Sequence, residues 1–131
     1  MKLKKIIPFL LSALMLTGCT GTSEQANTYR QISMDEAVAL MANETDYIIL
    51  DVRRPDEFAA GHIPNAINVP NETIGTSEIP ELPNKKQLVL VYCRSGRRSK
   101  EAAEKLVELG YTNIVEFGGI LDWKGEIVSE E

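Results

Sequence analysis

The 131-residue sequence is short of positive charge. It holds 14 lysine and arginine residues against 19 aspartate and glutamate residues, and its formal net charge is −5. An acidic surface repels the phosphate backbone, so this balance argues against a nucleic-acid partner. Any site for a small anion must therefore be a local group of basic residues. The chain also lacks internal repeats and low-complexity segments, and its length predicts one folded domain.

The sequence also lacks an apolar run long enough to cross a bilayer, which takes roughly 20 residues as a helix. Its longest run, residues 6–16, is broken by Pro8 and Ser12 and follows three lysines within the first five residues. A short apolar core behind a positive start is typical of an export signal that is later removed. We therefore expect residues 1–18 to be a signal peptide.

The apolar run ends in Leu16-Thr17-Gly18-Cys19, which resembles the lipobox of bacterial lipoproteins. The resemblance implies cleavage before Cys19 and acylation of this residue, which would anchor the protein in a cell membrane on the extracytoplasmic face. The alternative is an ordinary signal peptide with an incidental cysteine. Residues 19–30 are small and polar, and we expect them to form a flexible tether ahead of a domain at 31–128.

Cysteine is scarce: the chain has only Cys19 and Cys93. In an exported protein two cysteines would normally suggest a disulfide. If Cys19 carries lipid, Cys93 has no partner within the chain. An unpaired thiol in an oxidising compartment is a liability, which favours a chemical role for Cys93.

Strand-like and helix-like segments alternate along the rest of the chain. The expected elements are a helix from the capping box Ser33–Glu36, a strand at 47–52, a helix opening at 55–57, strands at 66–69 and 88–92, a helix at 99–109, a strand at 114–117 and a short helical stretch around Trp123. Residues 71–86 are predicted to be a long polar loop. This alternation predicts an α/β fold, with a small parallel sheet and helices on both faces.

Cys93 directly follows the strand at 88–92, at the edge of a parallel sheet where ligands usually bind. The loop that begins there reads Cys93-Arg94-Ser95-Gly96-Arg97-Arg98-Ser99. Gly96 permits a tight curl in which successive backbone N–H groups point at one spot, and a helix N-terminus adds positive potential. With three arginines nearby, Cys93 should hold its thiolate form. The alternative is a buried structural thiol, for which this basic setting is poor.

Two kinds of cysteine chemistry use such a loop. Thiol phosphatases carry arginine six positions after the cysteine, where this chain has Ser99, and its last arginine, Arg98, comes one residue early. The smaller loop should hold a sulfur-sized group better than a phosphoryl group. This spacing resembles the active-site loop of the single-domain rhodaneses.

Further segments resemble the rhodanese signature in the expected order. They are Asp51-Val52-Arg53, Glu57-Phe58, Gly61–Ala66, Asn68–Pro70, Gly118-Gly119 and Trp123. The resemblance covers nearly all of residues 31–126 and implies the rhodanese fold and a sulfurtransferase activity.

The reaction implied by the resemblance has two steps. Cys93 attacks the outer sulfur of a donor such as thiosulfate, becomes a persulfide and passes the sulfur to cyanide or a thiol. The loop from Arg94 to Ser99, with Ser95, Gly96, Arg97 and Arg98 between them, would hold the sulfur and the departing sulfite. No general base, metal or other cofactor is implied. The expected partners are a small sulfur-containing anion, a thiol acceptor and a redox or sulfur-relay protein.

Three residues outside the loop leave alternatives open. His62, the only histidine, invites a Cys–His dyad, but it matches a turn position of the rhodanese signature. Asp51 and Arg53 could form a buried ion pair that supports the site, or Arg53 could face the anion. Two other functions also stay open: a rhodanese module that only binds a partner, and a phosphatase or arsenate reductase.

Overall fold

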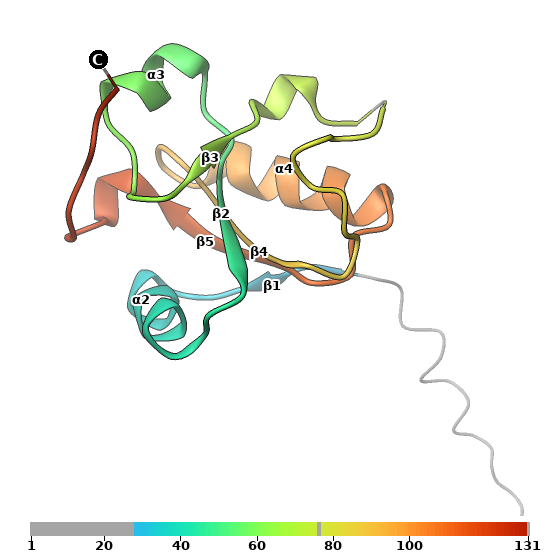
Figure 1. Cartoon of the computed structure of the whole chain (residues 1–131), viewed down its shortest axis with the longest axis horizontal. Coiled ribbons are helices and arrows are strands. Elements are labelled where there is room, and N and C mark those ends of the chain that lie inside the picture. Colours follow the sequence, from blue (N-terminus) through green and yellow to red (C-terminus); the bar gives the residue numbers. More distant parts are fainter. Residues whose placement is uncertain (1–27, 76, 131) are drawn as a thin grey trace, which may run out of the picture.

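The computed structural model describes residues 28–75 and 77–130 (Figure 1). The proposed signal peptide, Cys19 and most of the proposed tether lie outside the described residues. In the part described, no helix is long and apolar enough to span a membrane.

Five parallel strands form one sheet in the order β1-β5-β4-β2-β3. The strands are β1 (Arg30–Gln31), β2 (Tyr47–Asp51), β3 (Ile67–Asn68), β4 (Leu88–Cys93) and β5 (Ile114–Gly119). The central strand β4 is an apolar run, and Val89, Leu90 and Val91 are fully buried because helices cover both faces of the sheet.

Helices lie on both sides of the sheet (Figure 1). They are α2 (Met34–Asn43), α3 (Pro55–Ala60) and α4 (Arg97–Glu108), with short 3₁₀ turns η3 (Asn71–Thr73) and η4 (Ile120–Asp122). Helix α4 packs Ala102, Ala103 and Leu106 into one apolar cluster. Helices α2 and α3 place Ala37 and Phe58 in a second cluster on the opposite face. The α/β class with a parallel sheet covered on both faces is thus confirmed.

Three details differ from the sequence-based expectation. Strand β1 was not expected; its two residues pair with Val115 and Glu116 of β5. Helix α4 begins at Arg97 rather than near Ser99, because Gly96 ends the loop in a left-handed conformation with φ 115°. The loop at 71–86 is not wholly polar, since it buries Ile74, Ile79 and Leu82 in the cluster beneath α4.

Candidate active site

Cys93 is the last residue of β4 and lies at the carboxyl edge of the sheet, between β2 and β5. Its thiol is free, and the residue is only 1% exposed. On the β5 side Cys93 pairs with Gly119. A side chain at Gly119 would collide with the carbonyl group of Arg94, so the loop after Cys93 passes directly over this glycine.

The loop after Cys93 curls back over the sulfur. The backbone N–H of Gly96 donates to Sγ at 3.0 Å, and the thiol donates to Oγ of Ser99 at 3.4 Å. Ser99 lies in the first turn of α4 and is fully buried. A sulfur anion here is stabilised by a backbone donor and by the positive end of a twelve-residue helix.

The three arginines of the loop have different surroundings. Arg98 forms a two-pronged ion pair with Glu57 of α3, with Nη1–Oε1 at 2.8 Å and Nη2–Oε2 at 3.2 Å. This hydrogen bonding lowers the pKa of Glu57 to about 2 and raises the pKa of Arg98, to which the charge of Cys93 also contributes. Arg97 is exposed and pairs with Glu101 at 3.1 Å.

Arg94 and Ser95 complete the loop on its outer side, where both are exposed. Among the described residues, Arg94 makes no ion pair. Its carbonyl accepts a hydrogen bond from the N–H of Leu121 at 3.2 Å, which fixes the loop to η4. Of the three arginines, Arg94 therefore has the charge that is least offset by carboxylates.

Glu116 lies behind the sulfur and was not expected at the site. It is 1% exposed, and its Oε2 accepts from Ser99 Oγ at 2.6 Å and from the Gly118 N–H at 3.0 Å. The sequence contains a signal for it, a single acid within the apolar strand Ile114–Phe117. Alternation along β5 places Glu116 on the same face as Ile114, beneath α4.

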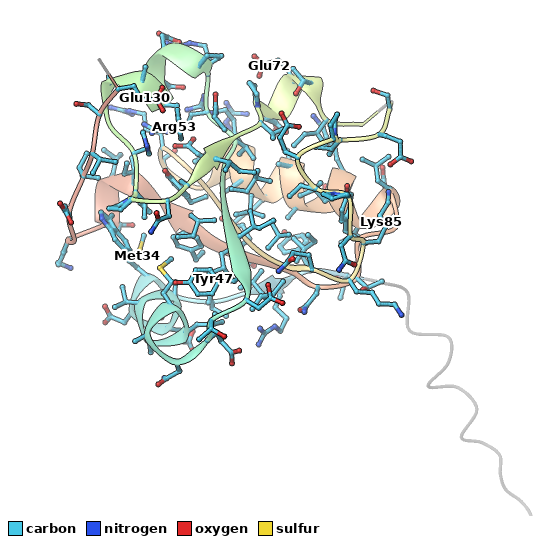
Figure 2. All side chains as sticks on the ribbon, viewed as in Figure 1. Met34, Tyr47, Arg53, Glu72, Lys85 and Glu130 are labelled. Atoms are coloured by element: carbon cyan, nitrogen blue, oxygen red, sulfur yellow. The ribbon has the colours of Figure 1, made fainter. Side chains whose placement is uncertain are left out.

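Asp51, which pairs with Tyr92 of β4, and Arg53 form a buried ion pair. Figure 2 shows Arg53 close to α3. Arg53 Nη2 lies 2.7 Å from Asp51 Oδ2 and also donates to the Gly61 carbonyl at 2.6 Å. Its guanidinium is directed at these oxygens and also lies 5.8 Å from the ring centre of Tyr92. Of the two roles considered for Arg53, the geometry favours the supporting ion pair.

His62 lies in the turn after α3. Its Nδ1 is 2.8 Å from the Phe58 carbonyl, and its ring stacks on that of Phe58 with centroids 3.7 Å apart. Its backbone forms an antiparallel bridge with Val128. Within the described ranges no hydrogen bond joins His62 to Cys93, so the structure does not bring a Cys–His dyad together.

Metal ligands do not cluster at this site. In the described part of the chain, no group of three histidine, cysteine, aspartate or glutamate side chains could hold a metal ion. The chemically active groups that the structure does bring together are the thiol of Cys93, the Gly96 amide, the Ser99 hydroxyl and the Glu116 carboxyl.

Comparison with known families identifies this arrangement. The model of the Rhodanese-like domain matches residues 33–126, which include the strand, the loop and helix α4. The chain belongs to the rhodanese family. The family resemblance inferred from the sequence is thereby confirmed for this domain.

Individual rhodanese relatives agree with the family match. The chain is 38% identical over 73 residues to thiosulfate sulfurtransferase PspE of Escherichia coli, covering 56% of this chain and 70% of that protein. It is 36% identical over 96 residues to a sulfurtransferase of Allochromatium vinosum, covering 71% and 86%. A rhodanese-like domain protein of Staphylococcus aureus superposes with a TM-score of 0.64 at 30% identity, covering 78% and 99%.

Proposed function

We propose that this chain is a sulfurtransferase that carries a sulfane sulfur on Cys93. The observation that carries the proposal is the position of Sγ: it accepts the Gly96 N–H at 3.0 Å, at the end of the central strand of a rhodanese domain. That amide and the helix N-terminus suit an anionic sulfur. Two relatives, PspE and a Coxiella burnetii GlpE protein, are named thiosulfate sulfurtransferases.

In the first step the Cys93 thiolate attacks the outer sulfur of thiosulfate. A new S–S bond forms to Cys93, the original S–S bond breaks, and sulfite leaves with its electron pair. In the second step the terminal sulfur bonds to an acceptor thiolate or to cyanide, and Cys93 recovers its electron pair as a thiolate. The enzyme therefore alternates between two covalent forms, which predicts ping-pong kinetics.

The exposed outer side of the loop is the proposed entrance for the donor. Arg94 and Ser95 are exposed there, and Arg94 has no ion pair among the described residues. A guanidinium free of carboxylates suits the sulfonate end of thiosulfate, because its planar fork binds two oxygens at once. Arg98 ties the loop to α3 through its ion pair with Glu57, and the Ser99 hydroxyl contacts the sulfur.

The test is to incubate the chain with thiosulfate and measure its mass. We expect a gain of one sulfur atom, lost when cyanide is added, and no gain in Cys93→Ser. Absence of a persulfide with thiosulfate and with other sulfane donors would overturn the proposal. Phosphate-ester hydrolysis or arsenate reduction in its place would identify the loop as that of a phosphatase or reductase. If the protein turned over none of these substrates, the remaining interpretation would be a rhodanese module that only binds a partner.

We further propose that the domain is held at the extracytoplasmic face of a cell membrane by lipid on Cys19. The support is the order of three features in residues 1–19: the lysines, the apolar run and the lipobox-like end. The folded domain then works at the end of a short polar tether.

A further inference from the structure

Glu116 is a buried carboxyl group without a cation. Asp51 and Glu116 are the two carboxyl side chains buried in the described residues, and Asp51 is matched by Arg53. No basic side chain of the described residues lies within ion-pair distance of Glu116. A carboxylate removed from water is costly unless a charge or a proton compensates it. Glu116 therefore needs an explanation other than an ion pair.

The contacts of Glu116 lead to Cys93. Ser99 Oγ has three acceptors within reach: Glu116 Oε2 at 2.6 Å, the Gly96 carbonyl at 3.0 Å and the Gly118 carbonyl at 3.3 Å. The carboxyl is the nearest, and hydrogen bonds to charged acceptors are the shortest and strongest. On its other side Oγ accepts from the Cys93 thiol at 3.4 Å. The two hydrogen bonds thus point the same way: Sγ of Cys93 donates to Oγ of Ser99, and Oγ donates to Oε2 of Glu116.

We propose that Glu116 takes the proton of Cys93 through Ser99. The S–H bond breaks and the sulfur keeps its electrons; Oγ gains that proton and gives its own to Oε2 of Glu116. One negative charge moves from the carboxylate to the sulfur, so the buried charge is unchanged in total. Glu116 acts through Ser99 and is a positioning residue for the nucleophile. The inference rests on the proposed function only in taking Cys93 as the reacting group.

The surrounding charges favour one negative charge shared by this pair. Arg98 of α4 interacts electrostatically with Cys93, but Glu57 of α3 offsets its charge. Next to β1, burial raises the pKa of Tyr29, and the charges of Glu104 and Glu116 raise it further. Among the described residues, no basic side chain within ion-pair distance offsets a second anion at Glu116. If one negative charge is shared in this way, the proposal predicts that the pair releases its two protons in two separate steps.

The first experiment is the pH dependence of Cys93 alkylation by iodoacetamide, measured on the full chain. In the unaltered protein we expect the rate to rise in two steps. In Glu116→Gln the rate should rise in a single step. Its midpoint should lie about one pH unit or more below the upper step of the unaltered protein, because a neutral amide cannot repel the thiolate. Its amide oxygen can still accept both hydrogen bonds of the carboxyl. The control Glu104→Gln removes an exposed charge from α4 and should keep two steps.

The second experiment is infrared spectroscopy at the pH between the two steps. We expect a protonated-carboxyl band that shifts in deuterium oxide, is absent in Glu116→Gln and is lost in Cys93→Ser. The proposal is overturned by a single alkylation step in the unaltered protein, or by a carboxyl band that persists unchanged in Cys93→Ser. Neither measurement uses a sulfur donor, so failure of the relay and failure of persulfide formation are separate results.

Discussion

Arg98 interacts with two partners, Glu57 and Cys93. Its guanidinium binds both oxygens of Glu57, and its charge also acts on the sulfur. The residues of the pair are 41 positions apart in the sequence, so no local pattern indicates it. The three arginines of the loop were expected to add positive charge around the sulfur, whereas Arg97 and Arg98 are matched by glutamates.

Replacing Arg98 with alanine should slow alkylation of Cys93 at neutral pH by about two- to tenfold. The change removes a positive charge near the sulfur and leaves the Glu57 carboxylate with Arg54 alone, whose backbone N–H lies 2.9 Å and whose Nη1 lies 4.0 Å from Oε1. Arg97→Ala is the matched control, since Arg97 pairs outward with Glu101 and should matter little. The double variant Glu57→Ala/Arg98→Ala should recover part of the rate. Equal rates in the two single variants would contradict this account.

The ionisation of Glu57 should make the free energy of unfolding of the domain depend on pH in the acidic range. The hydrogen bonds from Arg98, with a smaller contribution from Arg54, lower the pKa of Glu57 from 4.5 to about 2. These contacts therefore stabilise the folded state above pH 4.5 and lose this effect as the pH falls towards 2. We expect about 1 kcal/mol, because solvent screens a pair so near the surface. Urea unfolding between pH 2 and pH 6 measures it. Glu57→Gln should unfold with a correspondingly flatter pH dependence.

At the scale of elements, the loop between β4 and α4 depends on one backbone conformation. Gly96 has φ 115°, which places its N–H on the sulfur and starts the helix at Arg97. A residue with a Cβ is strained there even though space is available, since the nearest atom to an added Cβ is Gly118 Cα at 3.8 Å.

Gly96→Ala should therefore lower the free energy of unfolding by about 1–2 kcal/mol and also reduce the reactivity of Cys93. Gly110 is a matched control: its φ is 102°, and an added Cβ would meet no atom within 4 Å. Gly110→Ala should cost similar stability and leave alkylation of Cys93 unchanged. If both variants lose reactivity alike, general destabilisation explains the loss and the amide contact does not.

How far the sequence predicts these elements depends on how local their causes are. Strands β2 and β4 were expected because each is a continuous apolar run. Strand β1 has two polar residues and exists through its pairing with β5, which is a non-local cause. Ile74, Ile79 and Leu82 are too widely spaced to form a periodic pattern, yet the loop buries them beneath α4. The loop of Cys93 was predictable, whereas the position of Glu116 behind it required the register of β5 against β4.

At the scale of the whole molecule, the acidic domain and the proposed lipid anchor have opposite effects at a membrane. The formal net charge of −5 would become −8 once cleavage before Cys19 removed the three lysines of residues 1–18. Anionic lipid headgroups repel so acidic a protein, so binding should come from the lipid and not from the protein surface. The exposed Arg94 of the loop after Cys93, which is unpaired among the described residues, is a local exception to this acidic character.

Cys19→Ser should release the protein from the membrane of an expressing bacterium. Without the acylated cysteine the protein loses its acyl chains. Each CH₂ group of such a chain contributes about 0.8 kcal/mol to the free energy of membrane binding. Fractionation and the mass of the mature N-terminus measure this. Persulfide formation by the released protein should be unchanged. The anchor would be refuted if Cys19→Ser stayed with the membrane and the mature N-terminus of the unaltered protein carried no added lipid mass.

The burial of Cys93 also determines where a persulfide at this site can react. Its inner sulfur would remain covered by the Gly96 amide and Ser99. An acceptor thiol that struck the inner atom would form a mixed disulfide and release hydrogen sulfide. Steric protection of that atom would direct attack to the outer one, so the acceptor would leave with the sulfur and no hydrogen sulfide would be released.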